Sequence, residues 1–229
     1  PGFWKCYPAN YEEFLKPFKA LSYNYDCNVV NLKKYGVPQN RSRYLFLASK
    51  DYPIKLPPIT HGKGLLPYVT VKDAIKKYPQ LRAGSESSKI PNHTCYKLTS
   101  VTLQRLKNTP KNGGSRSSWP SELVLKCHQS QKGHSDVYGR MRWNDVAPTL
   151  TCRCISVSNG RFAHPTQNRG ISVREAAALQ TFSDDFIFLE PKSLAAKHIG
   201  NAVPPLSSKV IAMQIIQTVK CNSQILVPA

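Results

Sequence analysis

Residues 171–182 read ISVREAAALQTF, and residues 199–205 read IGNAVPP. In the first stretch Ser172 stands three residues before Glu175, which is the spacing of a capping box. In such a box the serine hydroxyl accepts a hydrogen bond from the Glu175 amide, and the carboxylate accepts one from the Ser172 amide. The pattern predicts a helix that begins near Val173. The rest of the chain is organised around these two stretches.

The second stretch has the composition of a tight turn followed by a helix. Gly200 and Asn201 tolerate a positive φ angle, and Pro204 and Pro205 suit the first turn of a helix. We therefore predict that the Gly-Asn-Ala-Val turn presents backbone amides ahead of a helix N-terminus, an arrangement that holds small polar ligands. The alternative for Asn201 is a plain turn former.

A third stretch lies far upstream, where residues 35–43 read YGVPQNRSR. It separates a predicted strand over residues 27–31 from the apolar run over residues 44–48. That run has the composition of a strand buried in the middle of a mixed or parallel sheet. The sequence therefore predicts a strand, a basic turn and a second strand in this part of the chain.

A helix is predicted before these strands, because apolar residues recur three and four positions apart at Tyr11, Phe14, Leu15, Phe18 and Leu21. Asn10 and Glu13 are placed as its cap pair. Pro17 removes one hydrogen bond of the helical ladder, so we expect this helix to be kinked or split near Lys16.

The middle of the chain is basic and rich in turns. Residues 53–67 are rich in Pro and Gly and predict a crossover or linker, after which Thr70 caps a short helix that ends before Pro79. Residues 98–108 have helical spacing with Ser100 as the cap. Residues 109–120 are interpreted either as a flexible linker or as a loop shaped to approach a nucleic-acid backbone.

The charge of the chain indicates a polyanionic partner. Its 32 Lys and Arg residues against 13 Asp and Glu give a formal net charge of +19, in a chain with 41% apolar residues. Such an excess is typical of a folded nucleic-acid-binding protein, although charge alone does not separate DNA from RNA. There is no apolar run near 18 residues, so we expect a cytoplasmic protein and no membrane partner.

The seven cysteines are odd in number and scattered, which does not indicate a disulfide framework. The candidate zinc ligands are His93, Cys95, Cys127, His128, Cys152 and Cys154. They lack the usual Cys-x-x-Cys pairs of a zinc site. We therefore expect free thiols and no metal.

Three stretches together resemble one family. Residues 169–182 resemble the ninth sequence block of the cytosine-5 DNA methyltransferases, and residues 199–204 resemble the tenth. Residues 35–43, with the pattern Gln-x-Arg-x-Arg entering a strand, resemble the eighth. The blocks follow one another in the family's order, which makes the combined match more specific than any one block.

The resemblance implies an α/β fold with part of a Rossmann-like methyltransferase sheet and a small, loop-rich DNA target-recognition domain. Residues 1–82 are expected to hold the C-terminal part of the catalytic sheet and a linker. Residues 83–162 are expected to form the target-recognition domain. Residues 163–229 are expected to return to the catalytic domain, with the cofactor-pocket turn and a final helix.

The family's first half carries a Gly-containing turn for S-adenosylmethionine, a Pro-Cys dipeptide with the nucleophile and a Glu-Asn-Val strand, and none of these occurs here. We therefore expect the carboxyl-terminal half of a methyltransferase, which recognises duplex DNA, shares S-adenosylmethionine with a first-half chain and is inactive alone. The alternatives are a non-catalytic DNA-binding module derived from the same fold and a basic RNA-binding protein.

The resemblance also implies roles for single residues. Arg43 matches the arginine that contacts the carbonyl of the flipped cytosine, where a permanent charge stabilises the charge that develops on thiolate attack. The alternative for Arg43 is a surface salt bridge. Arg41 is expected to hold the turn or a neighbouring element, and Gln39 to satisfy backbone groups.

Cofactor and DNA contacts are implied in the same way. Asn201, Ala202 and Val203 match the tenth block, which lines the cofactor pocket in the family. DNA contacts, chiefly to phosphates, are expected from Arg116, Arg140, Arg142, Thr149, Thr151 and Arg153. We also expect an unpaired sheet edge. The apolar residues Phe3, Trp4, Phe14 and Phe18 are expected to have their packing partners in the first half.

Overall fold

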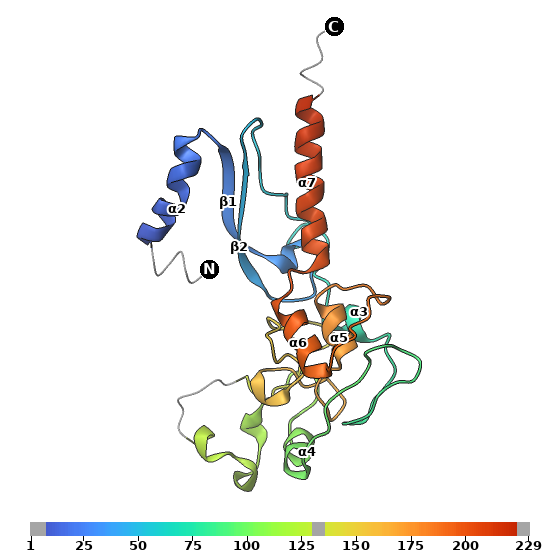
Figure 1. Cartoon of the computed structure of the whole chain (residues 1–229). Coiled ribbons are helices and arrows are strands. Elements are labelled where there is room, and N and C mark those ends of the chain that lie inside the picture. The colour runs from blue at the N-terminus through green and yellow to red at the C-terminus, as the bar shows by residue number, and fades with distance from the viewer. Residues whose placement is uncertain (1–7, 130–135, 224–229) are drawn as a thin grey trace.

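The computed structural model describes residues 8–129 and 136–223. Figure 1 shows two groups of elements stacked end to end. The sheet group consists of α2 (Pro8–Ala20), β1 (Asn24–Asn31), β2 (Ser42–Ser49) and α7 (Pro205–Ser223). The loop group contains α3 (Val71–Ile75), α4 (Ser100–Lys107), α5 (Val173–Leu179) and α6 (Lys192–Asn201). Short 3₁₀ helices complete the described elements: η1 (Leu32–Tyr35), η2 (Arg116–Ser118), η3 (Ser121–Leu123), η4 (Lys126–His128) and η5 (Val157–Asn159).

The two strands occur where the sequence predicts them and form one antiparallel ladder. Asn24 lies opposite Ser49, and Asn31 lies opposite Ser42. The predicted position of the second strand inside a mixed or parallel sheet is wrong for the described residues. Within them β2 pairs only with β1, and every residue of β2 is half-buried. Helix α2 lies on one side of the strands and α7 on the other (Figure 1).

Helix α2 runs through Pro17, so of the predicted kink or split near Lys16 the split does not occur. The predicted cap residue Asn10 lies inside the helix, because α2 begins at Pro8. Proline suits this position, since the first amide of a helix has no intrahelical acceptor.

Two aromatic residues of α2 have partners within this chain. The rings of Phe14 and Phe18 pack against the ring of Phe46 in β2, with centroids 5.1 and 4.8 Å apart. The expectation that their partners lie outside the chain is therefore wrong in part, although Phe14 is still 39% exposed. Phe3 and Trp4 lie outside the described residues.

The main hydrophobic core lies in the loop group around α5. Its buried residues come from three parts of the chain, residues 71–78, 141–162 and 171–199. The predicted capping box is present: the Ser172 hydroxyl accepts from the Glu175 amide at 3.0 Å, and the Glu175 carboxylate accepts from the Ser172 amide at 2.7 Å. Thr70 caps α3 through the same motif, and that helix ends at Ile75, as predicted.

Residues 109–120 form a packed loop. Trp119 is buried, and its indole nitrogen donates to the Thr109 hydroxyl at 2.9 Å. A Cβ atom at Gly114 would meet the Pro110 carbonyl oxygen at 2.2 Å, so only glycine fits there. The helix before this loop, α4, is capped by Thr99 and not by Ser100, because the Thr99 hydroxyl accepts from the Thr102 amide.

The structure at residues 200–203 also differs from the predicted tight turn. Gly200 and Asn201 complete α6, and residues 202–204 connect it to α7. The amide of Ala202 donates to the His198 carbonyl at 2.9 Å and is therefore unavailable to a ligand. Glycine is required at 200 for a different reason: a Cβ atom there would meet the Thr151 carbonyl oxygen at 2.1 Å.

Helix α7 is covered along only part of its length. Near its start Leu206 and Val210 pack against a buried cluster of Leu32, Tyr35 and Val37. Farther along, apolar side chains face solvent at Met213, Ile215, Ile216 and Val219. Among the described helices, α7 included, none is long and apolar enough to cross a membrane.

Candidate functional site

Three distant segments of the chain meet at Arg41, and we call this place the junction. The Arg41 guanidinium is buried and donates to the carbonyl oxygens of Leu150 at 3.0 Å, Gly200 at 3.1 Å and Ala202 at 3.5 Å. Burial, and then the charge of nearby Arg43, lower the pKa of Arg41 to about 10, so the group stays charged at neutral pH. Arg41 therefore holds the segment around Leu150 against the end of α6.

Gln39 supports the same junction from the side of α5. Its carbonyl oxygen accepts from the Leu150 amide at 2.9 Å, and its amide nitrogen donates to the Gln180 side chain at 2.5 Å. Gln180 in turn donates to the carbonyl oxygens of Ile199 and Ala202. These buried bonds connect residues 35–43, 169–182 and 199–204, the three stretches singled out in the sequence.

Arg43 lies at the edge of the junction, and its guanidinium makes one hydrogen bond within the described residues. One guanidinium nitrogen donates to the Ser42 carbonyl at 2.7 Å, and the side chain is half-buried. Burial lowers the pKa of Arg43, but a guanidinium remains charged at working pH. Within the described residues Arg43 makes no ion pair, so the alternative of a surface salt bridge has no counterpart there.

The predicted cofactor residues lie beside the junction. Asn201 is exposed, and its side-chain oxygen accepts from the Cys152 thiol at 3.0 Å. The carbonyl of Ala202 is occupied by Gln180 and Arg41. The Val203 side chain is 66% exposed. Together they offer an amide and an apolar surface, which fit one edge of a cofactor pocket.

The residues predicted to contact DNA separate into two kinds. Thr151, Arg153 and Arg142 are exposed, whereas Thr149 is half-buried and donates to the Asn40 carbonyl at 2.5 Å. Arg116 is half-buried in a different part of the loop group. The Thr149 hydroxyl is therefore used within the fold, whereas the exposed side chains of Thr151, Arg153 and Arg142 can reach a DNA backbone without rearrangement.

Arg140 is a correction to the sequence-based prediction. Its side chain is 1% exposed, and its guanidinium donates to the carbonyl oxygens of Leu106, Thr109, His164 and Gln167. Burial lowers its pKa. With its donors used by the backbone of the loop group, Arg140 is unavailable to a phosphate and fixes the fold of this region.

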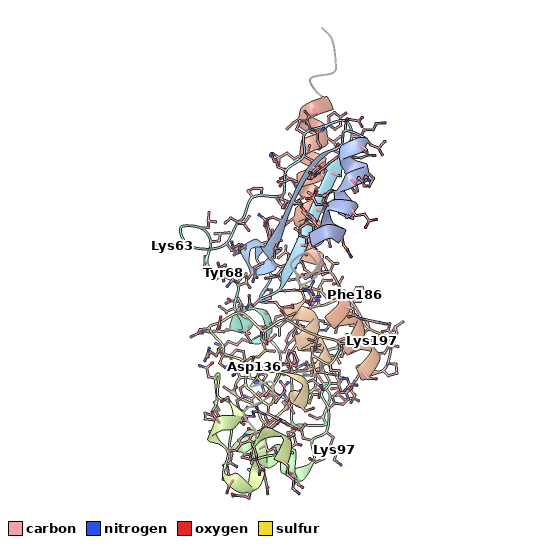
Figure 2. All side chains as sticks on the ribbon, turned by 90° about the vertical axis from the view of Figure 1, so that its left-hand side faces the viewer. Lys63, Tyr68, Lys97, Asp136, Phe186 and Lys197 are labelled. Carbon is pink, nitrogen blue, oxygen red and sulfur yellow. The ribbon has the colours of Figure 1, made fainter. Side chains whose placement is uncertain are left out.

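A cationic cavity of about 520 Å³ opens next to Asn201, between α6 and the segment that follows Thr151. Arg153 and Lys197 both line it, and neither makes an ion pair within the described residues. Figure 2 shows Lys197 at the outer side of the loop group. The remaining wall is rich in hydroxyl groups and includes Tyr96, Ser156, Ser158 and Ser193.

Two buried groups of the core were missed by the sequence analysis. Arg169 pairs with Glu175 through two hydrogen bonds of 2.7 Å, beside the buried ring of His164. Gln180 belongs to the quoted stretch 171–182 but had no assigned role. The sequence did contain a signal for these bonds. The helical pattern of α5 places polar residues, both charged and uncharged, at core positions. In the described residues no group of His, Cys, Asp and Glu could hold a metal ion.

Comparison with known proteins gives concordant results. The Type II methylase M.HgiDII of Herpetosiphon aurantiacus is 38% identical over 211 residues, covering 90% of this chain and 59% of that protein. The Type II methyltransferase M1.HphI of Haemophilus parahaemolyticus is 36% identical over 206 residues, covering 90% of this chain and 51% of that protein. The chain thus spans little more than half the length of these relatives.

A solved structure has a similar fold. The DNA modification methyltransferase encoded within an E. coli prophage aligns with a TM-score of 0.63 and 21% identity, over 90% of this chain and 64% of that chain. The model of the C-5 cytosine-specific DNA methylases matches residues 8–217. Because this match covers nearly the whole chain, the protein belongs to the C-5 cytosine-specific DNA methylase family.

Proposed function

We propose that this chain supplies the base-contacting and DNA-contacting part of a DNA cytosine-5 methyltransferase, which transfers the methyl group of S-adenosylmethionine to a cytosine in duplex DNA. The observation that carries the proposal is the junction. There the three stretches meet through buried hydrogen bonds, and the guanidinium of Arg43, which makes no ion pair within the described residues, lies at the edge.

Arg43 has the properties that this reaction needs from a positioned cation. The target cytosine must leave the base stack, because its ring carbon is unreachable inside the duplex. When a thiolate adds to the ring, negative charge develops toward the base carbonyl, and a guanidinium stabilises it by charge and hydrogen bonding. Arg41 and Gln39 act indirectly, because their hydrogen bonds in the junction hold the backbone around Arg43.

S-adenosylmethionine supplies the methyl group when it is bound. Asn201 and Val203 are proposed to form one edge of its pocket, with Ala202 fixed between them by Gln180. The 229 residues contain no Pro-Cys dipeptide, so we assign the nucleophile and the rest of the pocket to a first-half polypeptide. That polypeptide is either a separate chain or continuous with this sequence.

The exposed cations of the loop group are proposed to contact DNA. Arg142, Arg153 and Thr151 face solvent, and Lys197 adds a second charge to the cavity beside Arg153. We propose that residues 83–162 form the target-recognition domain and that residues 1–82 and 163–229 belong to the catalytic domain. The alternative, a non-catalytic module, would keep the DNA contacts and lack methyl transfer.

The sheet group is proposed to bind the first half. Its sheet has only two strands within the described residues, and α7 exposes a row of apolar side chains. Apolar surface of this kind is typical of a protein interface. Covering it would remove water from the apolar atoms of α7 and so stabilise the folded state.

The test is methyl transfer from labelled S-adenosylmethionine to duplex DNA. We expect no transfer by this chain alone and transfer by its mixture with the part of the Herpetosiphon methylase that lies outside the matched region. The melting temperature of the mixture should rise with activity, because the partner binds only the folded state. Robust methylation by the purified single chain would exclude the first-half requirement. DNA binding without any transfer by the mixture would favour the non-catalytic module.

A further inference from the structure

A second cationic cavity lies at the end of the molecule remote from α7, among the short turns η2, η3 and η4 (Figure 1, green). Its volume is about 260 Å³. It is lined by Ser115, Arg116, Ser117, Trp119, Val124 and His128. None of these residues belongs to the junction or to the cavity beside Asn201.

Two nitrogen atoms of the lining residues are buried and have no hydrogen-bond partner among the described residues: Nη1 of Arg116 and Nδ1 of His128. Nearly all buried polar atoms in folded proteins are bonded, so an unpaired pair in one cavity indicates a ligand. A guanidinium nitrogen can only donate, and therefore the partner that Arg116 lacks is an acceptor.

The charges around the cavity favour an anionic acceptor. Burial, and then the positive charges of Arg116 and Arg105, lower the pKa of His128, and the Tyr138 ring beside it brings no charge. Arg116 makes no ion pair in the described part of the chain. A bound anion would accept from Arg116 and from Nδ1 of His128, since a neutral imidazole donates from whichever ring nitrogen carries the proton. The hydroxyls of Ser115 and Ser117, which bond to each other at 2.7 Å, lie in the same wall.

The size of the cavity limits the ligand. Pockets for drug-sized molecules measure about 300 to 1,000 Å³, so this one suits a small group and not a base or a nucleoside. A tetrahedral oxyanion with bound water matches both the volume and the donors. A phosphate is such a group, and donors from several short turns can surround it.

We propose that this cavity binds one phosphate of the DNA backbone, with Arg116 and His128 as the donors. The assignment rests on the proposed function, because it takes duplex DNA as the substrate. Contacts to phosphates fix the register of a protein on the duplex without reading its sequence. The cavity would thus anchor η2 and η4 on the backbone while other loops face the bases.

The first test compares three versions of the 229-residue chain in duplex DNA binding at several salt concentrations: wild type, Arg116→Gln and Lys126→Gln. Lys126 is the control, because it is exposed on η4, carries the same charge and does not line the cavity. Loss of one phosphate contact should weaken binding by Arg116→Gln about tenfold and reduce the salt slope by about one. Lys126→Gln should change both quantities by much less. Equal effects of the two variants would overturn the assignment to this cavity.

A second variant and a second probe separate geometry from charge. Arg116→Lys keeps the charge but loses the planar donors, so it should still lose most of the affinity. Inorganic phosphate should shift the imidazole resonances of His128 in the wild type and not in Arg116→Gln, with thermal melts confirming that both are folded. A shift by phosphate combined with unchanged DNA binding by Arg116→Gln would mean that the site takes free phosphate and that the DNA assignment is wrong.

DNA binding by the wild type and by Arg116→Gln distinguishes a failure of the proposed function from a failure of the phosphate site. If the wild-type chain binds no duplex DNA, the proposed function fails and the phosphate assignment with it. If the wild type binds DNA and Arg116→Gln binds equally well with the same salt slope, only the assignment to this cavity fails.

Discussion

The loop group and the sheet group differ in which side chains they bury and which they expose. In the loop group Arg140, Arg169 and Arg174 are almost completely buried, and their guanidinium groups are bonded to backbone carbonyls or to Glu175. In the sheet group the apolar side chains of α7 remain exposed. The loop group therefore satisfies these three buried charges internally, whereas the sheet group has the surface of one side of an interface. Burial also divides the arginines into two kinds. Those with donors used inside the fold are unavailable to a ligand, and the others are available.

The largest loss of stability is expected in the loop group, when a buried charge loses its partner. Glu175→Ala leaves the Arg169 guanidinium buried without its partner and removes one of the two hydrogen bonds of the capping box of α5. Loss of one member of a buried pair destabilises a protein by about 3–5 kcal/mol, measured here by thermal unfolding. Lys77→Ala, which breaks the exposed pair with Asp184, is the control and should cost less than about 1 kcal/mol. Similar losses of unfolding free energy in the two variants would contradict the expected difference between a buried and an exposed ion pair.

Arg41 and Arg43 test the junction with a matched pair. Arg41→Met leaves the carbonyls of Leu150 and Gly200 without their donor, which should destabilise the chain by about 2–4 kcal/mol. Arg43→Ala loses one bond to the adjacent Ser42 carbonyl and should leave the melting temperature nearly unchanged. In the assembled enzyme, however, it should lower the methylation rate about a hundredfold. A normal rate in folded Arg43→Ala would remove its electrostatic role.

Acid should weaken the loop group through His164. Its Nδ1 accepts from the amides of Thr166 and Gln167, and burial lowers the pKa of the ring to about 4. The unfolded state takes up a proton near pH 6.5, whereas the folded state resists it down to about pH 4. Stability is therefore full above this window and falls as the pH decreases through it, by up to about 3 kcal/mol.

The variant His164→Asn tests this dependence, because an asparagine oxygen can replace Nδ1 as the acceptor and does not titrate. Its unfolding free energy should change less between pH 6.5 and pH 4 than that of the wild type. His198→Asn, which replaces a half-exposed ring paired with Glu190, is the control and should keep the wild-type slope. An unaltered slope in His164→Asn would assign the acid sensitivity to another group.

The smallest effect on stability is expected in the sheet group. Ile216→Lys on α7 changes an exposed side chain, so the chain alone should unfold within about 0.5 kcal/mol of the wild type. The same change should reduce the rise in melting temperature and the methyl transfer produced by the first half. Thr218→Ala on the same helix changes a half-buried hydroxyl bonded within α7 and serves as the control. If Ile216→Lys is rescued as fully as the control, α7 is not the interface.

Features set by neighbouring residues could be predicted from the sequence. The capping boxes at Thr70 and Ser172 form as expected, since their atoms are three residues apart. The strands predicted over residues 27–31 and 44–48 are present, and in the structure they extend over residues 24–31 and 42–49. The family could also be identified, because the three stretches keep their composition and order whatever their contacts.

Two predictions failed because they depend on distant contacts. Arg140 and Arg153 are the same residue type in the same basic region, yet one is buried among carbonyls and the other faces a cavity. Gly200 was expected in a turn, but it is required by the approach of the Thr151 backbone. Neither outcome is encoded by the residues within one helical turn of the position concerned.

The amino-acid sequence by itself determined the family, the capped helices, the two strands and the basic character of this protein. Only the tertiary structure decided which arginines hold the fold and which are free to bind a ligand. The physical reason is that burial arises from segments far apart in the chain: Arg41 reaches the Gly200 carbonyl across 159 residues. A guanidinium that satisfies buried carbonyls stabilises the fold, and one left with free donors can bind an anion.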